Sequence, residues 1–229
     1  MTSLDVKLLN HTPDPERAVA SAARLCYAPV GAAELIKGMD DAEVARILRV
    51  IMRSGHHSAL EHASYSFAID GVSRALTHQL VRHRLASYNQ QSQRYVAFAG
   101  GPEVVVPPLI AADPQLCAQF DAAVAQAWEA YQALLAAGIE AEDARYLLPN
   151  AAVTKIVVTM NIRELLHFFT VRCCNRAQWE IRQLATLMLE LAAPTAPYIF
   201  LDAGAPCRRG PCPEGSMTCN EPFERITRP

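Results

Sequence analysis

The chain has 229 residues, 51% of them hydrophobic and 19% charged, which is typical of a globular protein with a substantial core and excludes a disordered one. Its formal net charge of -2 argues against general affinity for a nucleic acid polymer. No apolar run reaches the roughly 18–20 residues of a membrane span, and residues 1–10 show no secretory signal. We therefore expect a cytoplasmic protein that binds neither a membrane nor a nucleic acid polymer.

Hydrophobic spacing predicts helices and strands along the first half of the chain. A strand is predicted at residues 5–9, followed by helices at 18–26 and 40–53, the second of which ends at Gly55. Alternating apolar side chains predict a strand at 64–69, and Ser73 is typical of the cap of a helix from 74 to about 83. The polar residues after that helix are expected to form a loop.

The second half is predicted to be mainly helical. Helices are expected at residues 113–137, 140–147, 162–171 and 176–191, and a β-branched strand at 153–160. Strands and helices do not alternate as in a doubly wound sheet, so we expect an α+β fold with a single domain over residues 1–200. Seven of the 15 prolines follow Ala193. Residues 201–229 are therefore predicted to be a Pro/Cys-rich extension, an extended arm rather than a domain.

The segment Arg82–Tyr95 contains three arginines, one histidine, hydroxyls and amides, and no acid, glycine or proline. Such residues are unsuited to a core, because an unpaired buried charge is too costly. Guanidinium groups bind phosphate with two parallel hydrogen bonds, and hydroxyls and amides can recognise a base or a sugar. The segment therefore predicts a site for a planar ligand that carries phosphate.

The sequence indicates neither a glycine-rich nucleotide-binding loop nor a nucleophilic serine. Neither a GxGxxG nor a GxxxxGK[ST] loop is present, so a nucleotide cofactor would have to be bound by arginines and helix ends. No GxSxG turn surrounds Ser92. A serine nucleophile needs an adjacent base, so we interpret Ser92 as a hydrogen-bonding residue and keep the nucleophile as an alternative.

A metal site is weakly indicated. His56, His57, Glu61 and His62 lie close together, but the pattern HExxH is absent, and histidines five residues apart do not share a helical face. The spacing Cys207-x4-Cys212-x6-Cys219 lacks the paired CxxC of zinc sites. We expect no metal; a metallohydrolase built on these histidines remains an alternative.

A second polar cluster lies downstream, in the helix predicted at 162–171. Arg163 and His167 are four residues apart and share a helical face. Phe168 and Phe169 are expected to hold that helix in the core. The cluster therefore predicts a polar site at the edge of the core.

The polar segment resembles the signature of the flavin-dependent thymidylate synthases, RHRx7S in its short form and RHRxxSxNxxSxRY in full. Every fixed position of the full motif is met, by Arg82, His83, Arg84, Ser87, Asn89, Ser92, Arg94 and Tyr95. The upstream residues Gly55, His56, Ser58, Glu61 and His62, and the downstream residues 161–163, Arg172 and 177–181, also resemble the family. The resemblance covers the chain from about residue 50 to 200.

The resemblance implies an enzyme that methylates dUMP to dTMP. Its carbon donor would be 5,10-methylenetetrahydrofolate and its reductant NADPH, acting through bound FAD. The family fold is a twisted, mostly antiparallel sheet flanked by helices, and its members are homotetramers with active sites shared between subunits. A non-catalytic nucleotide- or RNA-binding module that uses the Arg82–Arg94 cluster is the alternative.

The resemblance also implies roles for individual residues. Those expected to contact FAD are His56, Ser58, Arg82, His83, Arg84, Gln90, Asn161, Arg163 and His167. Those expected to bind dUMP are Gln79, Arg82, Gln90, Ser92, Gln93, Arg94, Arg145 and Arg172. Arg172 is the expected catalytic residue, because a permanently charged guanidinium can stabilise negative charge that develops on the uracil. Arg176 stands where some members have histidine.

Overall fold

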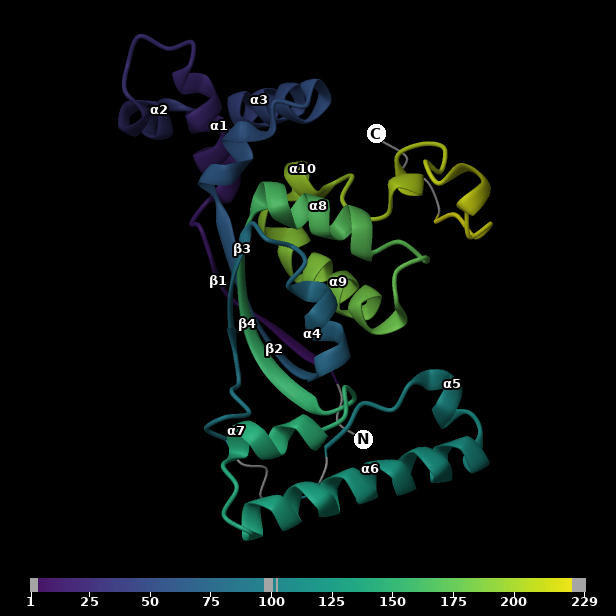
Figure 1. The fold of residues 1–229 in the computed structure, drawn as a ribbon. Coiled ribbons are helices and arrows are strands. Elements are labelled where there is room, and N and C mark those ends of the chain that lie inside the picture. Colours follow the sequence, from purple (N-terminus) through teal and green to yellow (C-terminus); the bar gives the residue numbers. More distant parts are fainter. Residues whose placement is uncertain (1–3, 97–100, 102, 224–229) are drawn as a thin grey trace. The chain divides into compact units, whose positions relative to one another are not determined.

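The structure is a computed structural model that describes residues 4–96, 101 and 103–223 (Figure 1). Four strands form one sheet in the order β1-β2-β4-β3. They are β1 (Asp5–His11), β2 (Ser64–Ser73), β3 (Ala86–Gln90) and β4 (Val153–Asn161). Neighbouring strands run antiparallel, as the 2.8 Å hydrogen bond between Ser66 and Thr159 and the 3.1 Å bond from Arg74 N to Ala152 O indicate. The sheet and its helices confirm the prediction of a single α+β domain.

Helices make up most of the remaining described chain. They are α1 (Pro15–Leu25), α2 (Ala32–Gly38), α3 (Asp41–Ser54), α4 (Arg74–Leu80), α5 (Pro108–Ala111), α6 (Pro114–Ala136), α7 (Ala141–Ala144), α8 (Ile162–Arg172), α9 (Trp179–Ala192) and α10 (Pro197–Phe200). Short 3₁₀ turns occur at η1 (His57–His62), η2 (Arg145–Leu147), η3 (Ala193–Thr195), η4 (Pro206–Arg208) and η5 (Gly215–Met217). No helix in the described part of the chain is long and apolar enough to cross a membrane.

The domain divides into two compact units, which we describe separately. Unit 1 contains Ile69–Arg82, Asn89–Val157 and the start of the chain up to Asp5. Unit 2 contains Val6–Ala68, His83–Tyr88 and the chain from Val158 onward. Strands β2 and β4 each continue from one unit into the other.

Unit 2 contains a core formed by α1, α3, α8, α9 and α10. Asp40 caps α3 by accepting a 2.7 Å bond from Glu43 N, and Gly55 ends it with a φ of 71°, a conformation that glycine adopts without strain. Asn161 caps α8 in the same way, with a 2.9 Å bond from Glu164 N. One side of α8 is buried through Phe168 and Phe169, while Arg163 and His167 remain exposed on the other side.

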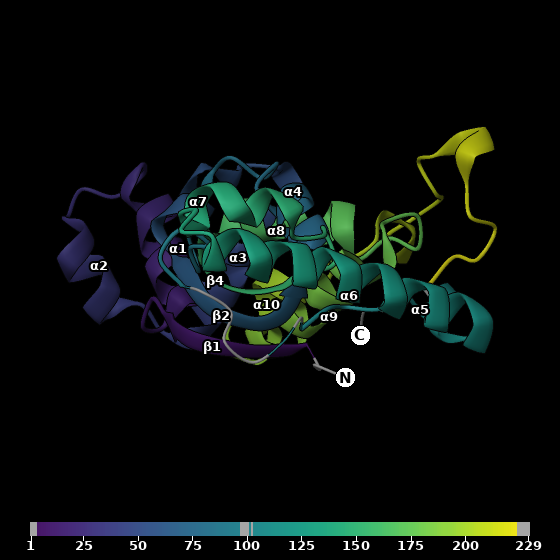
Figure 2. The same cartoon turned by 60° about the horizontal axis from the view of Figure 1, so that its bottom comes forward.

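Unit 1 contains α4 and a helical layer formed by α5, α6 and α7. Asp113 caps α6 with bonds to the N–H groups of Gln115 and Leu116. Figure 2 shows α7 lying beside α6, and the two helices are in contact. In α6, Val124 and Tyr131 are the buried residues.

Several local predictions are wrong. Residues expected to form a loop after α4 form β3, in which exposed and half-exposed residues alternate because it is an edge strand with little cover. Helix α4 ends at Leu80 rather than near 83, α9 begins at Trp179 rather than 176, and α2 and α5 were not predicted.

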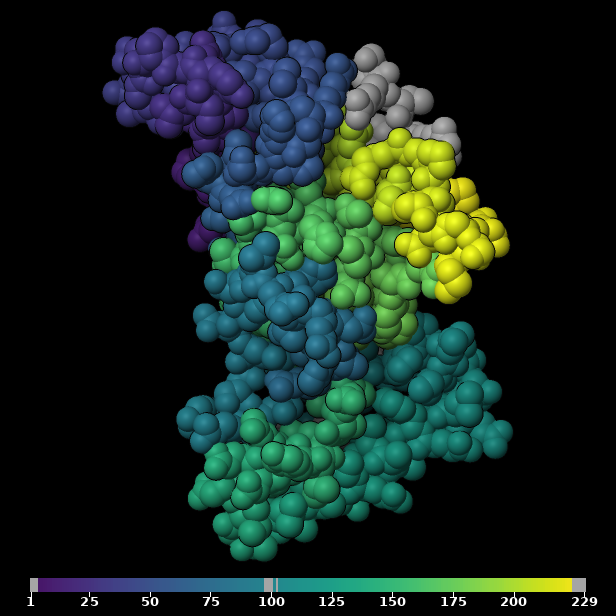
Figure 3. All heavy atoms as spheres, turned by 45° about the horizontal axis from the view of Figure 1, so that its top comes forward, coloured from purple at the N-terminus to yellow at the C-terminus, as the bar shows by residue number. Residues whose placement is uncertain are grey.

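The tail is also not an extended arm. Its described residues, 201–223, include the 3₁₀ turns η4 and η5, and Ala203, Ala205 and Cys207 are buried. Residues 224–229 of the predicted extension lie outside the described residues. In Figure 3 the tail (yellow) lies against the green residues of unit 2. Proline prevents long helices here but is well tolerated in the first turn of short ones.

The cap of α4 gives a first prediction. Ser73 is buried, and its Oγ accepts a 3.0 Å bond from Leu76 N. Ser73→Ala leaves that N–H without its partner, so we expect the free energy of unfolding to fall by about 1 kcal/mol. Chemical denaturation measures this change. Ser216→Ala, at an exposed serine of the tail, should leave stability unchanged; equal values for the two variants would contradict the capping role.

Candidate active site

A chain of hydrogen bonds in unit 2 links three ionisable residues, of which His83 and Glu164 are buried and Arg172 is half-buried. His83 has an exposed fraction of 5%, and both of its ring nitrogens are engaged. Its Nε2 accepts a 3.1 Å bond from Nε of Arg172, the last residue of α8. Its Nδ1 lies 3.2 Å from Oε1 of Glu164, which is buried in the first turn of α8. Both ends of α8 are therefore connected through one imidazole.

The geometry fixes the tautomer of His83. A guanidinium can only donate hydrogen bonds, so the Nε2 that faces Arg172 carries no proton. Nδ1 must then carry the hydrogen and donate it to Glu164. Burial, aided by the charges of Arg172 and His167, lowers the pKa of His83 to about 4 and so keeps the imidazole neutral near pH 7. Burial also raises the pKa of Glu164, an effect that His167 opposes.

Packing holds the imidazole in place. The ring lies 5.0 Å from that of Phe168 at an interplanar angle of 82°. Tyr88 of β3 donates a 2.7 Å bond to the backbone carbonyl of His83. The ring and the backbone of His83 are therefore each held by a neighbour, which limits the directions in which Arg172 can point.

These contacts bear on two sequence-based expectations. His83 was expected to contact FAD, and in the structure both of its ring nitrogens are bonded within the protein, to Arg172 and Glu164. Glu164 was not predicted as a site residue. It lies three positions after the cap residue Asn161, where glutamate is typical of a helix start. Glu164 and His83 are 81 positions apart in sequence, so the sequence alone did not indicate their contact.

Unit 2 also contains a large cavity of about 800 Å³. Glu164 forms part of its wall, together with Met52, His57, Leu85, Arg163, Leu166, His167, Thr170, Ile199, Asp202 and Arg209. Cofactor sites are commonly of this size and combine apolar walls with a few polar groups. Arginine and histidine donors suit the anionic part of a flavin dinucleotide, and the apolar side chains suit its ring system. The residues present therefore fit such a cofactor.

Apart from Arg82 and Gln90, which belong to unit 1, the other residues expected at the flavin lie in unit 2 in different settings. Arg163 forms an ion pair with Glu61 of η1. His56 and Ser58 are exposed and line a second cavity, of about 590 Å³, together with residues of α1 and α3. Arg84 is exposed, and Asn161 caps α8. The structure brings Arg163 and His167 into one cavity but places His56 and Ser58 in another.

Unit 1 gathers three of the residues expected to bind dUMP around Glu142. Arg94 binds the Glu142 carboxylate through Nε at 2.6 Å and Nη2 at 2.5 Å. Arg145 donates a 2.9 Å bond to the Glu142 carbonyl, and Ser92 Oγ accepts a 3.2 Å bond from Arg94 N. Burial lowers the pKa of Arg74, with a further contribution from Arg145. The result is a cluster of arginines suited to an anion.

Apart from Arg172, which belongs to unit 2, the remaining residues of this expected set also lie in unit 1. Gln90 donates two 3.2 Å bonds through Nε2, to the hydroxyls of Thr77 and Thr154, so its amide is anchored between α4 and β4. Gln79 and Gln93 are half-exposed, and Arg82 is exposed. The sequence analysis did not single out Arg74 or Glu142, because neither lies in the recognisable motif.

Three observations bear on the metal and nucleophile alternatives. Within the described residues, no group of three or more His, Cys, Asp or Glu side chains is arranged to hold a metal ion. His56 and His62 are exposed rather than held in the core. The hydroxyl of Ser92 accepts a bond from a backbone N–H, which suits a binding residue better than an activated nucleophile.

Comparison with known proteins identifies the family. Residues 7–198 match the family model described as "Thymidylate synthase complementing protein". The "Flavin-dependent thymidylate synthase" of Geobacter sulfurreducens is 57% identical over 222 residues, which cover 96% of each chain. The enzyme of that name from Clostridium tetani is 47% identical over 96% of this chain and 94% of its own.

A solved structure supports the same relationship. The UMP/dUMP methylase PolB from Streptomyces cacaoi, bound with 5-Br dUMP, has a TM-score of 0.77 and 27% identity. The alignment covers 87% of this chain and 94% of PolB. Fold, site and relatives define a methyltransferase that depends on a flavin. The chain belongs to the flavin-dependent thymidylate synthase family, as its RHRx7S segment indicated.

The neutral state of His83 gives a prediction on pH dependence. The folded protein resists protonation of His83 because its pKa is about 4, whereas the unfolded chain takes up a proton below about 6.5. Stability contributed by the neutral ring is therefore lost as pH falls from 6.5 to 4. We expect the Tm of the wild-type protein to fall more steeply over this range than the Tm of His83→Asn.

Scanning calorimetry at several pH values measures the difference. His62→Asn, at an exposed histidine, is the matched control and should keep the wild-type slope. Equal slopes for all three proteins would show that His83 is not held neutral in the fold.

Proposed function

We propose that this protein methylates dUMP to dTMP, with 5,10-methylenetetrahydrofolate as carbon donor and NADPH as reductant through bound FAD. The observation that carries the proposal is the orientation of Arg172 by a buried, neutral His83. It provides a fixed positive charge in a chain whose relatives are named flavin-dependent thymidylate synthases. The enzyme acts in the cytoplasm as a homotetramer with shared active sites.

Most of the residues that hold FAD belong to unit 2. Arg163 and His167, which line the larger cavity, bind its anionic groups, and Leu85, Leu166 and Ile199 exclude water from its apolar part. The remaining contacts come from His56, Ser58, Arg82, His83, Arg84, Gln90 and Asn161. The bound flavin supplies the reducing equivalents for methylation.

The phosphate of dUMP binds the arginine cluster of unit 1. Arg94 is paired with Glu142 at the surface, with side-chain exposures of 49% and 46%. Exposed pairs of this kind contribute little free energy, so a dianionic phosphate competes well for Arg94. Ser92 and Arg145 supply further donors. The uracil and sugar are recognised by Gln79, Arg82, Gln90 and Gln93.

Arg172 acts on the uracil. Its Nε is committed to His83, which fixes the plane of the guanidinium and leaves the charge spread over the remaining nitrogens. Burial lowers the pKa of Arg172, yet arginine remains protonated in proteins. An oriented cation that is partly removed from water stabilises negative charge as it develops on the ring. Glu164 and His83 act through Arg172 and are positioning residues.

The direct test is dTMP formation by the purified protein, with dUMP, the folate, FAD and NADPH present together or withheld one at a time. We expect product only when all are present. Product without the folate, or protein that takes up no flavin, would overturn the proposal. Binding of dUMP without any turnover would indicate the non-catalytic nucleotide-binding alternative.

Removal of the catalytic charge gives the next prediction. Arg172→Ala should lower kcat by about a thousandfold or more, with dUMP and FAD still bound, because transition-state charge loses its partner. Steady-state kinetics and flavin absorbance measure the two effects. Arg53→Ala, at an exposed arginine of α3, is the control for loss of a guanidinium. Turnover by Arg172→Ala at the control rate would refute the role.

A pair of variants separates the two ligand sites. Arg163→Ala should weaken FAD binding by roughly tenfold or more and leave dUMP affinity of the flavin-loaded protein within about twofold. Arg94→Ala should weaken dUMP binding by roughly tenfold or more and leave FAD affinity within about twofold. Each variant is the control for the other, and equilibrium dialysis with each ligand gives the result. Loss of both ligands in both variants would contradict the assignment of separate residues.

A further inference from the structure

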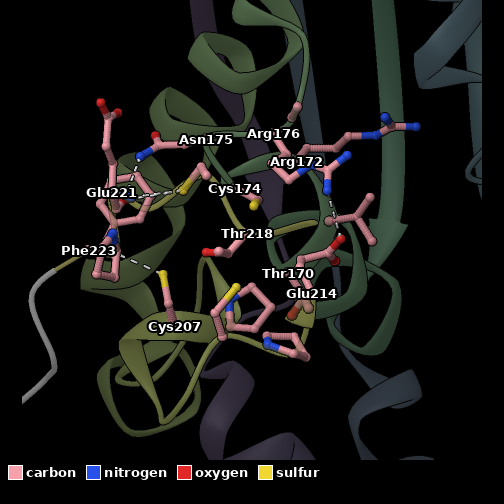
Figure 4. Close-up of a pocket in the computed structure, with 17 residues that line it drawn as sticks. Thr170, Arg172, Cys174, Asn175, Arg176, Cys207, Glu214, Thr218, Glu221 and Phe223 are labelled. Carbon is pink, nitrogen blue, oxygen red and sulfur yellow. Dashed lines mark hydrogen bonds and ion pairs between the residues drawn. The ribbon is translucent and has the colours of Figure 1, made fainter. Parts of the chain in front are cut away.

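The segment after Ala205 folds against the connection between α8 and α9, residues 173–178, which begins immediately after Arg172. Figure 4 shows the cavity, about 410 Å³ in volume, that lies where this segment meets the connection. Arg172, Asn175 and Arg176 form part of its wall, and Cys207, Glu214 and residues 218–223 form another part. All of this segment lies beyond the residues 7–198 matched by the family model.

Asn175 joins the connection to both α9 and the tail. Its Nδ2 donates a 3.0 Å bond to the Glu221 carbonyl, and its Oδ1 accepts a 3.3 Å bond from Nη1 of Arg182 in α9. The same Arg182 nitrogen donates a 3.0 Å bond to the Asn175 carbonyl. Both sides of the Asn175 amide are used, so its orientation is fixed.

Arg176 makes the second link to the tail. It forms a 3.5 Å ion pair with Glu214, marked in Figure 4, and donates a hydrogen bond to the Met217 carbonyl. Asn175 and Arg176 therefore bind three positions of the tail: Glu214, Met217 and Glu221.

The end of the described tail is itself held in place. Phe223 N donates a 3.4 Å bond to Sγ of Cys207, and Glu221 N donates a 3.4 Å bond to Sγ of Cys219. Cys207 is buried, with an exposed fraction of 9%. Residues 207–223 thus form a loop whose end returns to its start, and the burial of Cys207 reports whether this loop is closed.

We propose that residues Pro206–Phe223 form a brace that holds the α8–α9 connection, and that Asn175 and Arg176 are positioning residues for Arg172. The inference rests on the proposed function, in which Arg172 is catalytic. The last turn of a helix lacks part of its backbone hydrogen bonding and opens readily. Links three and four residues beyond Arg172 oppose that opening and keep Nε of Arg172 directed at His83.

Asn175→Asp is the sharpest test. The aspartate has nearly the same size and retains an acceptor for Arg182, but it replaces the NH2 donor with an oxygen facing the Glu221 carbonyl. We expect kcat to fall by about tenfold and the KM for dUMP to change by less than about twofold, because misplacement of a catalytic group affects the transition state. Arg176→Ala should act in the same direction, and Arg176→Lys, which keeps the charge, should restore most of the rate.

A second measurement reports the brace without any turnover. The alkylation rate of Cys207, measured by mass spectrometry, is compared with that of Cys26, which is exposed in the structure. In wild type, Cys207 should react slowly relative to Cys26. Asn175→Asp and Arg176→Ala should raise the Cys207 rate several-fold, and Ser216→Ala, at an exposed tail position, should leave both rates and kcat unchanged.

The outcomes are decisive in both directions. Faster Cys207 alkylation together with lower kcat supports the brace. Faster alkylation with wild-type kinetics, or slow alkylation in the linkage variants, overturns it. Failure of the proposed function is distinguishable, because it abolishes dTMP formation in wild type and Ser216→Ala as well, whereas failure of the brace leaves wild-type turnover intact.

Discussion

The hydrogen-bond chain from Glu164 through His83 to Arg172 is the constraint on which the rest of the site depends. His83 and Glu164 are buried, Arg172 is half-buried, and His83 is bonded to both of the others, so a change at one member alters the others. A neutral imidazole is essential to it, because a protonated ring would present an N–H to the N–H of Arg172. The burial that lowers the pKa of His83 is therefore part of how Arg172 is oriented.

The fold supports this chain from both ends of one helix. At one end, Asn161 caps α8, and Glu164 lies in the first turn. At the other end, Arg172 is the last residue of α8, and the connection that follows is linked to the tail by Asn175 and Arg176. Between these ends, Phe168 and Phe169 bury one side of α8 and leave Arg163 and His167 facing solvent on the other. One amphipathic helix thus combines core packing, the face proposed to contact the flavin and the proposed catalytic residue.

Many residues of the candidate site could be proposed from sequence because they lie in one contiguous motif. The spacing of Arg82, His83, Arg84 and Ser92 identified the family, and Ser73 and Gly55 marked helix boundaries through their local chemistry. Glu164 and Glu142 were missed because their roles arise from contacts distant in sequence. β3 was missed because an edge strand of polar residues lacks the apolar alternation that predicts a strand.

The tail shows the same limit. Its prolines and cysteines suggested an extended arm, but composition carries no information about the carbonyls of Met217 and Glu221, which Arg176 and Asn175 bind. Backbone acceptors are identical in every residue. Only a structure shows which of them a side chain reaches.

The central claim is that this chain uses reduced flavin and a fixed Arg172 to methylate dUMP. An anaerobic single-turnover experiment tests it most directly. The flavin-loaded protein is reduced, then mixed with dUMP and 5,10-methylenetetrahydrofolate, while visible flavin absorbance and dTMP are followed together. The account predicts that absorbance returns with one dTMP per flavin, and only when both substrates are present. Return of absorbance without dTMP, or no return with both substrates bound, would contradict it.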